Sequence, residues 1–411
     1  MMVEDLDLKV LAVETAEFAA DPMRFIAEAR SHHEWLATSS IGYVVTDQAA
    51  MSDIILLDGN LAMSVEAIVD IMGARDTGWG RFTLDMMLAR SGSTHRRLRN
   101  SVARVFQPRS VNRMRSQMRS VVADLLDEWT PKRSFDFSEF AANFPIAVMF
   151  KIMGVSSERI PMIRSSLEIQ GSSYALQPEM MPTIEAAYQT LWQFVESLID
   201  ARGPHGSEND LLDQLIAAHS SGELDAVELR QMLIFLFGAG YDTSKNQLTL
   251  IMAKMLENPS IWSRCARDRE YCDKVVEEGF RFWSPSNIYR TVTAPFTYRG
   301  VTFPVGTMLF FPTAVAGQDD RNFADPQRFD PERGQRNRHI AFGRGMHICL
   351  GQFMARAQIE EAVHLIAQRF SNPRLAGEVT WRPFPGVWGI KSLPIAFDPA
   401  PPLTASLVGS S

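Results

Sequence analysis

Cys349 follows a glycine-rich stretch and precedes another glycine, Gly351. Gly343 and Gly345 allow backbone angles that other residues avoid, so they favour a tight loop that presents the cysteine. This loop leads into a predicted helix at residues 352–370, and its N–H groups together with the helix N-terminus favour a thiolate over a thiol. A soft thiolate suits iron, and Gly351 leaves room beside it for a flat ligand. The alternative is a buried structural cysteine next to a glycine turn.

A second candidate site is the centre of the longest predicted helix. Asp225 and Glu228 have the spacing of a capping box at its start, and Asn258 precedes the proline that stops it. Its length is on the order of 50 Å at ~1.5 Å per residue, and its apolar character on several sides predicts a path through the protein's centre. Gly238 and Gly240 each cost roughly 1 kcal/mol relative to Ala. Either another group needs the space, or a second helix packs closely there.

Composition narrows the classes of protein to consider. The chain has 411 residues, a net charge of -7 and 46% hydrophobic residues. No stretch reaches the roughly 18 to 20 apolar residues of a membrane span, and the start is acidic rather than a cationic signal, so we expect a cytoplasmic protein. A pI of about 5.7 and the lack of a known motif argue against a nucleic-acid partner. Three cysteines argue against a disulfide framework, and Cys265 and Cys272 are expected to be inert thiols.

Helical patterns dominate the chain, with no internal repeat and no linker. We predict a mainly α fold with small peripheral β-sheets in one domain at residues 21–398. Residues 1–20 are expected to form an N-terminal segment that can be mobile, and residues 399–411 a disordered tail rich in Pro, Ala and Ser. Short β-segments bounded by Gly and Pro are predicted at residues 42–46, 296–303, 307–311 and 393–397.

The cysteine loop, residues 342–351, resembles the haem-ligand loop of the cytochrome P450 family. It matches at Phe342, at both loop glycines, at Cys349 and the glycine that follows, and at the His two positions before the cysteine. The resemblance implies the single-domain cytochrome P450 fold, haem b (iron protoporphyrin IX) as the cofactor, and Cys349 as the ligand of its iron. Phe342, Gly343 and Gly351 are then expected to lie against the haem.

Glu278 and Arg281 match the family's Glu-x-x-Arg motif, with both side chains on one helix face. The resemblance implies a buried structural pair behind the haem rather than a catalytic one. Its usual third partner is an arginine from the segment before the cysteine loop. Arg333 is the expected partner, and Arg336 is the alternative because residues 334–338 appear one residue longer than usual.

The centre of the long helix resembles the family's oxygen-binding groove. Thr243 lies four residues after Ala239, so its hydroxyl can bond the Ala239 carbonyl and open the helix locally. By resemblance, Ala239 and Gly240 border the haem. Thr243 and Asp242 are the expected catalytic residues, Thr243 by stabilising the activated oxygen and Asp242 by relaying protons from solvent.

Four cationic residues resemble the anchors of the haem propionates. His95 and Arg99 lie four apart on one helix face, Arg290 follows the Glu-x-x-Arg helix, and His339 precedes the cysteine loop. Buried propionates need such partners, because unpaired charge in an apolar site is very costly. Any one of the four could instead be an ordinary surface cation.

The resemblance implies a monooxygenase that inserts one oxygen atom of O2 into a C–H bond. Residues 63–87 are expected to form a lid, and the mostly apolar wall indicates a lipophilic small-molecule substrate. Each wall residue taken singly could equally be plain core. A peroxide-driven peroxygenase and a non-oxygenating haem-thiolate sensor are the alternatives, and the Asp–Thr pair argues against the first. The expected wall residues are Phe235, Gly238, Ser286, Ile288, Val387 and Trp388.

Electrons must come from another protein, because the chain has no flavin or iron–sulfur motif. Residues 86–123 contain many arginines and no Asp or Glu. In the family this region flanks the cysteine side, so a positive patch there would attract an acidic ferredoxin, itself reduced by a ferredoxin reductase. The alternative is a solvated helix face. We expect the protein to be a monomer.

Overall fold

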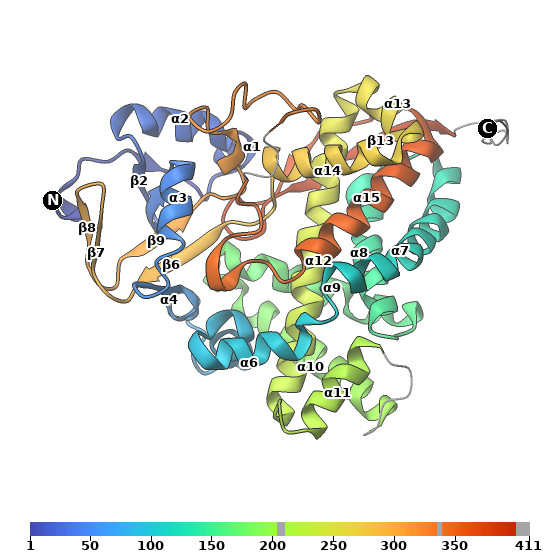
Figure 1. Cartoon of the computed structure of the whole chain (residues 1–411), viewed down its shortest axis with the longest axis horizontal. Coiled ribbons are helices and arrows are strands. Elements are labelled where there is room, and N and C mark those ends of the chain that lie inside the picture. Colours follow the sequence, from blue (N-terminus) through green and yellow to red (C-terminus); the bar gives the residue numbers. More distant parts are fainter. Residues whose placement is uncertain (204–209, 335–338, 400–411) are drawn as a thin grey trace.

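The computed structural model describes residues 1–203, 210–334 and 339–399. The fold is mainly helical with small sheets, as expected (Figure 1). The helices are α1 (Ala16–Ala20), α2 (Pro22–His32), α3 (Gln48–Ile54), α4 (Val65–Ile71), α5 (Gly78–Asp85), α6 (Gly92–Ala103), α7 (Pro108–Trp129), α8 (Phe137–Ile152), α9 (Ile160–Ser172), α10 (Met181–Arg202), α11 (Leu211–Ser220), α12 (Ala226–Leu256), α13 (Pro259–Arg267), α14 (Arg269–Phe282) and α15 (Gln352–Arg369).

The largest sheet has the strand order β1-β2-β3-β9-β6-β4, and a smaller sheet has the order β10-β13-β5. β7 pairs with β8 and β11 with β12 as two-stranded sheets. Each of the four predicted β-segments contains at least one strand. The strands are β1 (Val10–Leu11), β2 (Leu36–Ser39), β3 (Gly42–Val45), β4 (Leu61–Met63), β5 (Ser134–Asp136), β6 (Ile288–Val292), β7 (Phe296–Tyr298), β8 (Val301–Phe303), β9 (Met308–Phe311), β10 (Phe370–Leu375), β11 (Thr380–Trp381), β12 (Ile390–Ser392) and β13 (Pro394–Pro399).

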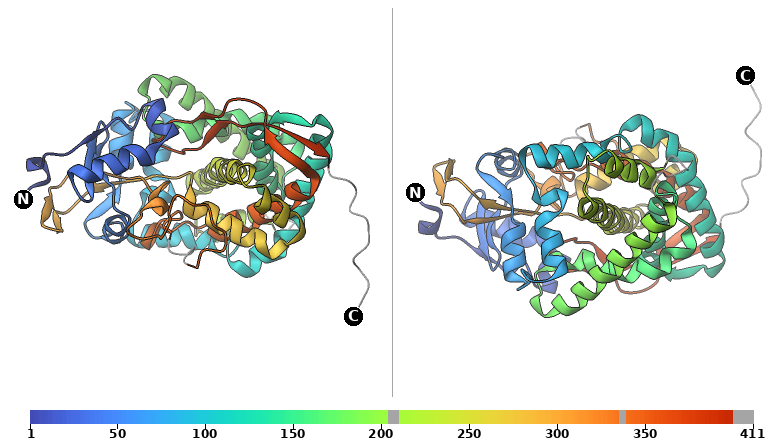
Figure 2. Two further views of the ribbon diagram at one scale, coloured as in Figure 1. Left: turned by 90° about the horizontal axis from the view of Figure 1, so that it is seen from above. Right: turned by 90° about the horizontal axis from the view of Figure 1, so that it is seen from below.

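The helix α12 runs through the middle of the molecule, and both views of Figure 2 show it end-on with other helices around it. Its predicted cap is confirmed: the Asp225 carboxylate accepts from the N–H groups of Val227 and Glu228, and the Asp225 N–H donates to the Glu228 carboxylate. α12 packs against α8, α9, α10, α14 and α15. Its central residues therefore reach the interior from a helix that is held on several sides. None of the helices in the described ranges has the length and apolar character that crossing a membrane requires.

The N-terminal twenty residues are built into the fold. Val3 is fully buried, β1 pairs in parallel with β2, and the Thr15 hydroxyl caps α1 by accepting from the Phe18 N–H at 3.2 Å. A β-bridge also joins Met2 to Thr302. The segment that we expected could be mobile therefore contacts the large sheet through β1 and the β7–β8 pair through Met2. The expected tail lies outside the described residues from position 400 onward.

A buried ion pair lies behind the cysteine loop, on α14. The Arg281 guanidinium donates to both oxygens of Glu278, at 2.8 and 2.7 Å, and neither side chain is exposed. Arg333 approaches the same carboxylate at 3.5 Å, which is the contact expected of it. Arg336 lies outside the described residues. Arg281 also fixes the chain before the loop by donating to the backbone carbonyls of Gly317, Pro326 and Arg328.

Candidate active site

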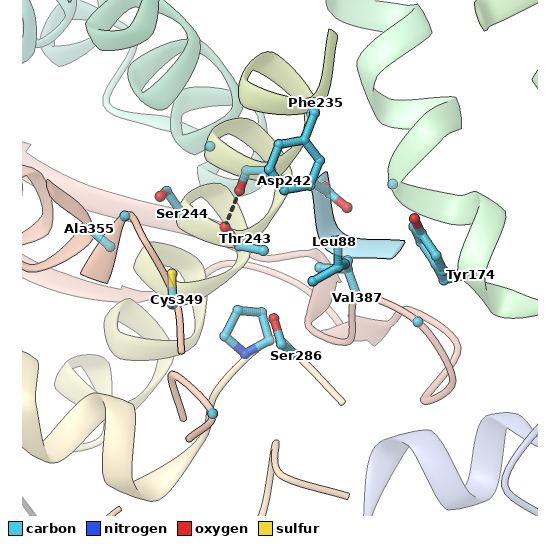
Figure 3. A pocket seen from close by; sticks show the side chains of 18 of the residues that line it. Leu88, Tyr174, Phe235, Asp242, Thr243, Ser244, Ser286, Cys349, Ala355 and Val387 are labelled. Atoms are coloured by element: carbon cyan, nitrogen blue, oxygen red, sulfur yellow. Dashed lines mark hydrogen bonds between the residues drawn. The ribbon is translucent and has the colours of Figure 1, made fainter. Parts of the chain in front are cut away.

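A cavity of about 410 Å³ extends from the centre of α12 to the loop that carries Cys349. Its wall is largely apolar, and Figure 3 shows side chains converging on it from several elements. The predicted lid, residues 63–87, contributes to the wall. Of the residues expected to contact substrate, the cavity is lined by Phe235, Gly238, Ser286, Ile288 and Val387.

The cysteine loop has the tight geometry that its glycines predicted. Gly343 and Gly345 adopt φ of 67° and 70°, in the left-handed region that other residues avoid. The Cys349 N–H donates to the Phe342 carbonyl at 2.8 Å and closes the loop. Phe342, Gly343, Cys349 and Gly351 all line the cavity, so the loop presents its sulfur to a space with little side-chain bulk around it.

The surroundings of Cys349 favour the neutral thiol when no metal is bound. Burial raises the pKa of the thiol, although the Gly351 N–H and the charges of Arg99 and Arg356 act in the opposite direction. The Gly351 N–H acts toward the thiolate, as expected of the loop, but desolvation outweighs it. A coordinating metal reverses this balance, since a metal-bound thiol loses its proton.

The centre of α12 forms another side of the cavity. The Thr243 hydroxyl donates to the Ala239 carbonyl at 2.7 Å, which is the predicted bond. The helix nevertheless continues without a break through these residues. The open space comes from the missing side chains, because a Cβ added at Gly238 would meet no atom within 4 Å. Ala239 and Gly240 also line the cavity as expected, and a Cβ at Gly240 would lie 2.5 Å from the terminal methyl of Met149.

Asp242 lines the same cavity but is only 1% exposed. One carboxylate oxygen bonds Arg382 at 2.6 Å and the Asn246 amide at 3.2 Å. The other oxygen has no hydrogen-bond partner among the described residues. A Cβ at Gly171 would lie 2.1 Å from that oxygen, so this glycine makes room for the carboxylate. No local pattern pointed to Arg382, which lies 140 positions from Asp242 along the chain.

A group of basic side chains lies beside the cysteine loop, and we call His95, Arg99, Arg290 and His347 the cation cluster. Arg290 and His347 line the cavity, and the His95 and His347 rings lie 4.7 Å apart. Burial lowers the pKa of Arg290 to about 10. Burial and the neighbouring cations lower the pKa of His347 to about 3.

The cation cluster has room for an anionic ligand. The Nδ1 atoms of His95 and His347 are buried and have no hydrogen-bond partner among the described residues. Arg99 lies at the edge, where it donates to the Ile348 carbonyl at 2.8 Å and does not line the cavity. Carboxylates of a bound cofactor would satisfy these groups and restore the charged forms.

His339 does not reach the cavity, which corrects its assignment as a propionate anchor. Its Nε2 contacts the Glu277 carboxylate at 3.0 Å, and Arg356 bonds the same carboxylate at 2.7 Å. The residue that takes its place in the wall is His347, two positions before Cys349. His347 matches the histidine that the family loop carries two positions before its cysteine. That match was noted in the sequence, but it was not assigned to a propionate anchor.

Trp388 does not contribute to the cavity wall, contrary to expectation. Neighbouring residues of an extended segment point in opposite directions, so Trp388 faces away when Val387 faces the cavity. Its indole N–H donates to the Ala19 carbonyl at 2.9 Å. Its ring stacks on Trp381 with centroids 5.1 Å apart, and it is fully buried. Trp388 is therefore part of the core.

The donor set at the site is a single sulfur. Cys265 and Cys272 are buried and lie outside the cavity wall, as expected of core thiols. Within the described ranges, no three His, Cys, Asp or Glu side chains converge as metal ligands. One sulfur donor suits an iron that brings its other ligands in a porphyrin.

Comparisons with known proteins point to one family. The family model described as Cytochrome P450 matches residues 80–387. The chain is 32% identical over 381 residues to luteothin monooxygenase from Streptomyces thioluteus, covering 91% of this chain and 93% of that protein. It is 31% identical to nocardicin C N-oxygenase from Nocardia uniformis subsp. tsuyamanensis, covering 72% and 75%. The crystal structure of CalO2 has a TM-score of 0.87 at 21% identity, covering 96% of this chain and all of that one.

Proposed function

The chain belongs to the cytochrome P450 family, and from this premise we propose that it hydroxylates a lipophilic small molecule. The family consists of haem-dependent monooxygenases that use O2 and external redox partners. In the proposed reaction one oxygen atom of O2 is inserted into a C–H bond. The other atom is reduced to water, which consumes two electrons and two protons. The observation that carries the proposal is that Cys349 and the Thr243 hydroxyl line one largely apolar cavity.

We assign the cofactor as haem b. Cys349 would ligate the iron, and the cation cluster would hold the propionates, since the buried Arg290 cation and the partnerless ring nitrogens of His95 and His347 call for anions. When bound, this haem supplies the O2-activating chemistry. The protein's part is to orient the substrate, deliver protons and exclude water.

Thr243 and Asp242 are the proposed proton-delivery residues. The Thr243 hydroxyl already donates to the Ala239 carbonyl, so its lone pairs are free to accept a hydrogen bond from water in the cavity. The Asp242 carboxylate is held by Arg382, whose side chain is 14% exposed whereas that of Asp242 is 2% exposed. Arg382 therefore orients a buried acid between the cavity and the surface, in a position suited to relaying protons inward.

Two measurements test the proposal. The reduced protein treated with carbon monoxide should show the red-shifted Soret band of thiolate ligation, and Cys349→Ser should abolish it. Turnover under ¹⁸O₂ should place one labelled atom in the product. An unlabelled product, or a band that survives in Cys349→Ser, would overturn the assignment.

The two alternative classes predict different behaviour. A peroxygenase would turn over faster with peroxide alone than with a ferredoxin system. A haem-thiolate sensor would bind lipophilic compounds without any compound-dependent O2 consumption. The pair of Asp242 and Thr243 on the cavity wall supports the monooxygenase over both, because neither alternative requires proton delivery at that point.

A ferredoxin is the proposed electron donor. Four arginines before and along the start of α7 are exposed and have no ion pair among the described residues, whereas Arg97 and Arg115 pair with glutamates. α6 borders the cysteine loop through the bond from Arg99 to Ile348. A positive surface here would steer an acidic ferredoxin toward the haem. We call these residues the exposed arginines: Arg96, Arg104, Arg109 and Arg113.

Charge reversal tests the ferredoxin surface. In Arg96→Glu/Arg104→Glu we expect kcat/KM for reduced ferredoxin to fall about tenfold at low ionic strength and the salt dependence to flatten. Arg374→Glu, an exposed site on β10, is the matched control. Equal rates in the two variants would remove the exposed arginines from the docking surface.

A further inference from the structure

Most polar side chains on the cavity wall are already satisfied by the protein. The hydroxyl groups of Ser173 and Thr313 and the amide of Asn287 donate to backbone carbonyls at 2.7, 2.6 and 2.7 Å. The Tyr289 hydroxyl accepts from the Gly386 N–H at 3.0 Å. These contacts hold the wall together and use the side-chain donors of Ser173, Thr313 and Asn287, whereas Tyr289 uses an acceptor site and keeps its O–H.

Tyr174 differs from these residues. Within the described chain, its hydroxyl has one hydrogen-bond partner, the Met86 sulfur at 3.9 Å. A thioether is a weak acceptor, so this contact leaves most of the donor strength unused. Burial raises the pKa of the hydroxyl to about 12, so the group is protonated at neutral pH and able to donate.

The position of Tyr174 separates it from the reacting end of the cavity. Figure 3 shows Tyr174 on the opposite side from Cys349, with Leu88 and Val387 between them. The basic side chains among the described lining residues, Arg290 and His347, belong to the cation cluster beside the cysteine loop. A ligand at Tyr174 therefore meets a neutral donor beyond an apolar stretch.

The backbone holds Tyr174 firmly in place. It lies in the 3-10 turn Ser173–Ala175, between α9 and α10. Gly386, with φ of 86°, comes so close that a Cβ on it would lie 3.0 Å from the Tyr174 carbonyl carbon. The hydroxyl is thus presented by a packed turn, and binding to it costs little additional ordering.

We propose that Tyr174 determines specificity by donating a hydrogen bond to a neutral acceptor, such as a carbonyl or ether oxygen, at the substrate end remote from the oxidised carbon. The inference rests on the proposed monooxygenase function and narrows its substrate class. The substrate is an elongated, mainly apolar molecule with one oxygen acceptor at the far end. A carboxylate is disfavoured there, because Tyr174 has no cationic neighbour on the described wall.

Matched probes test this directly in the haem-loaded protein. N-alkylimidazoles of increasing chain length fix one end at the iron, and each is made with a methoxy end and with the isosteric ethyl end. Dissociation constants come from the optical shift of the haem. At one chain length we expect the methoxy-to-ethyl affinity ratio to fall by about threefold to tenfold in Tyr174→Phe, which is the range of one hydrogen bond.

Two controls separate loss of the Tyr174 hydrogen bond from general damage to the cavity. Tyr188→Phe alters a buried tyrosine outside the cavity wall, so its affinity ratio should match that of the wild type. The ethyl-ended probes should bind equally to Tyr174→Phe and wild type, which shows that the cavity is intact. A ratio in Tyr174→Phe equal to the wild-type ratio at every length overturns the inference alone. Absence of any imidazole shift in the wild-type protein overturns the haem-thiolate function and the inference with it.

Discussion

The two ends of the active-site region satisfy their polar groups differently. Behind the cysteine loop, Glu278 accepts from Arg281, from Arg333 and from the Asp330 N–H, and no part of its side chain is exposed. At the far end of the cavity, the Tyr174 hydroxyl has only a thioether beside it among the described residues. The first arrangement stabilises one geometry of the cysteine loop. The second leaves binding capacity for a molecule from outside.

The largest effect is expected from Glu278→Gln. The change leaves Arg281 buried without a counter-charge, which costs roughly 3 to 5 kcal/mol of unfolding free energy. Urea unfolding and haem content measure it. Glu332→Gln is the control, because Glu332 forms exposed ion pairs with Lys274 and Arg264 and should change little. Equal losses of unfolding free energy in Glu278→Gln and Glu332→Gln would show that the buried pair does not stabilise the cysteine-loop end as described.

Thr243→Ala should uncouple turnover without unfolding the helix. We expect severalfold more peroxide released per electron, because the cavity loses the hydroxyl assigned to proton delivery. Thr249→Ala is the matched control, since the Thr249 hydroxyl makes the same kind of bond, to the Lys245 carbonyl at 2.8 Å, but does not line the cavity. Unchanged coupling in Thr243→Ala, measured by O2 and peroxide balance, would count against the assigned role.

Acid stability should depend on Glu277, beside the cysteine loop. Burial alone would raise the pKa of Glu277, but hydrogen bonds from His339 and Arg356 hold it at about 2, below its ordinary value of 4.5. A lowered carboxyl pKa stabilises the fold above pH 4.5, and this contribution disappears as the pH falls to about 2.

Glu277→Gln should therefore lower the free energy of unfolding by roughly 1 to 3 kcal/mol at neutral pH. The difference in unfolding free energy between the variant and the wild type, called the gap below, should narrow below pH 4.5. Denaturant unfolding at a series of pH values measures the gap. A gap that widens on acidification would contradict the sign of this contribution.

The smallest effect on stability is expected from Tyr174→Phe, within ~0.5 kcal/mol, because the hydroxyl has no strong partner to lose. Tyr289→Phe sharpens the comparison within the same cavity. It leaves the buried Gly386 N–H without its acceptor and should cost about 1 to 3 kcal/mol. Thermal or urea unfolding of both variants tests the difference, and a Tyr174→Phe cost equal to that of Tyr289→Phe would contradict it.

The features that could be predicted from sequence are those written in neighbouring residues. The capping box at Asp225, the bond from Thr243 to Ala239 and the pairing of Glu278 with Arg281 all follow from spacings of three or four residues on a helix. Such spacings fix geometry locally, whatever the rest of the chain does.

The features that were missed depend on contacts between distant segments. Arg382 reaches Asp242 from another part of the chain, and His339 is drawn away from the cavity by Glu277. Trp388 lies one residue beyond a correctly placed wall residue and points to the opposite side. No periodic pattern in the sequence encodes these partners, because they are set by how whole elements pack.

The bond between the Trp388 indole and the Ala19 carbonyl also bears on how the protein is made. The two groups are 369 positions apart. At about 5 to 20 residues added per second, a ribosome needs roughly 20 to 70 s to travel that far. The segment that carries Val387 can therefore dock only long after the Ala19 segment has been made. Until then the cavity lacks the part of its apolar wall that Val387 contributes.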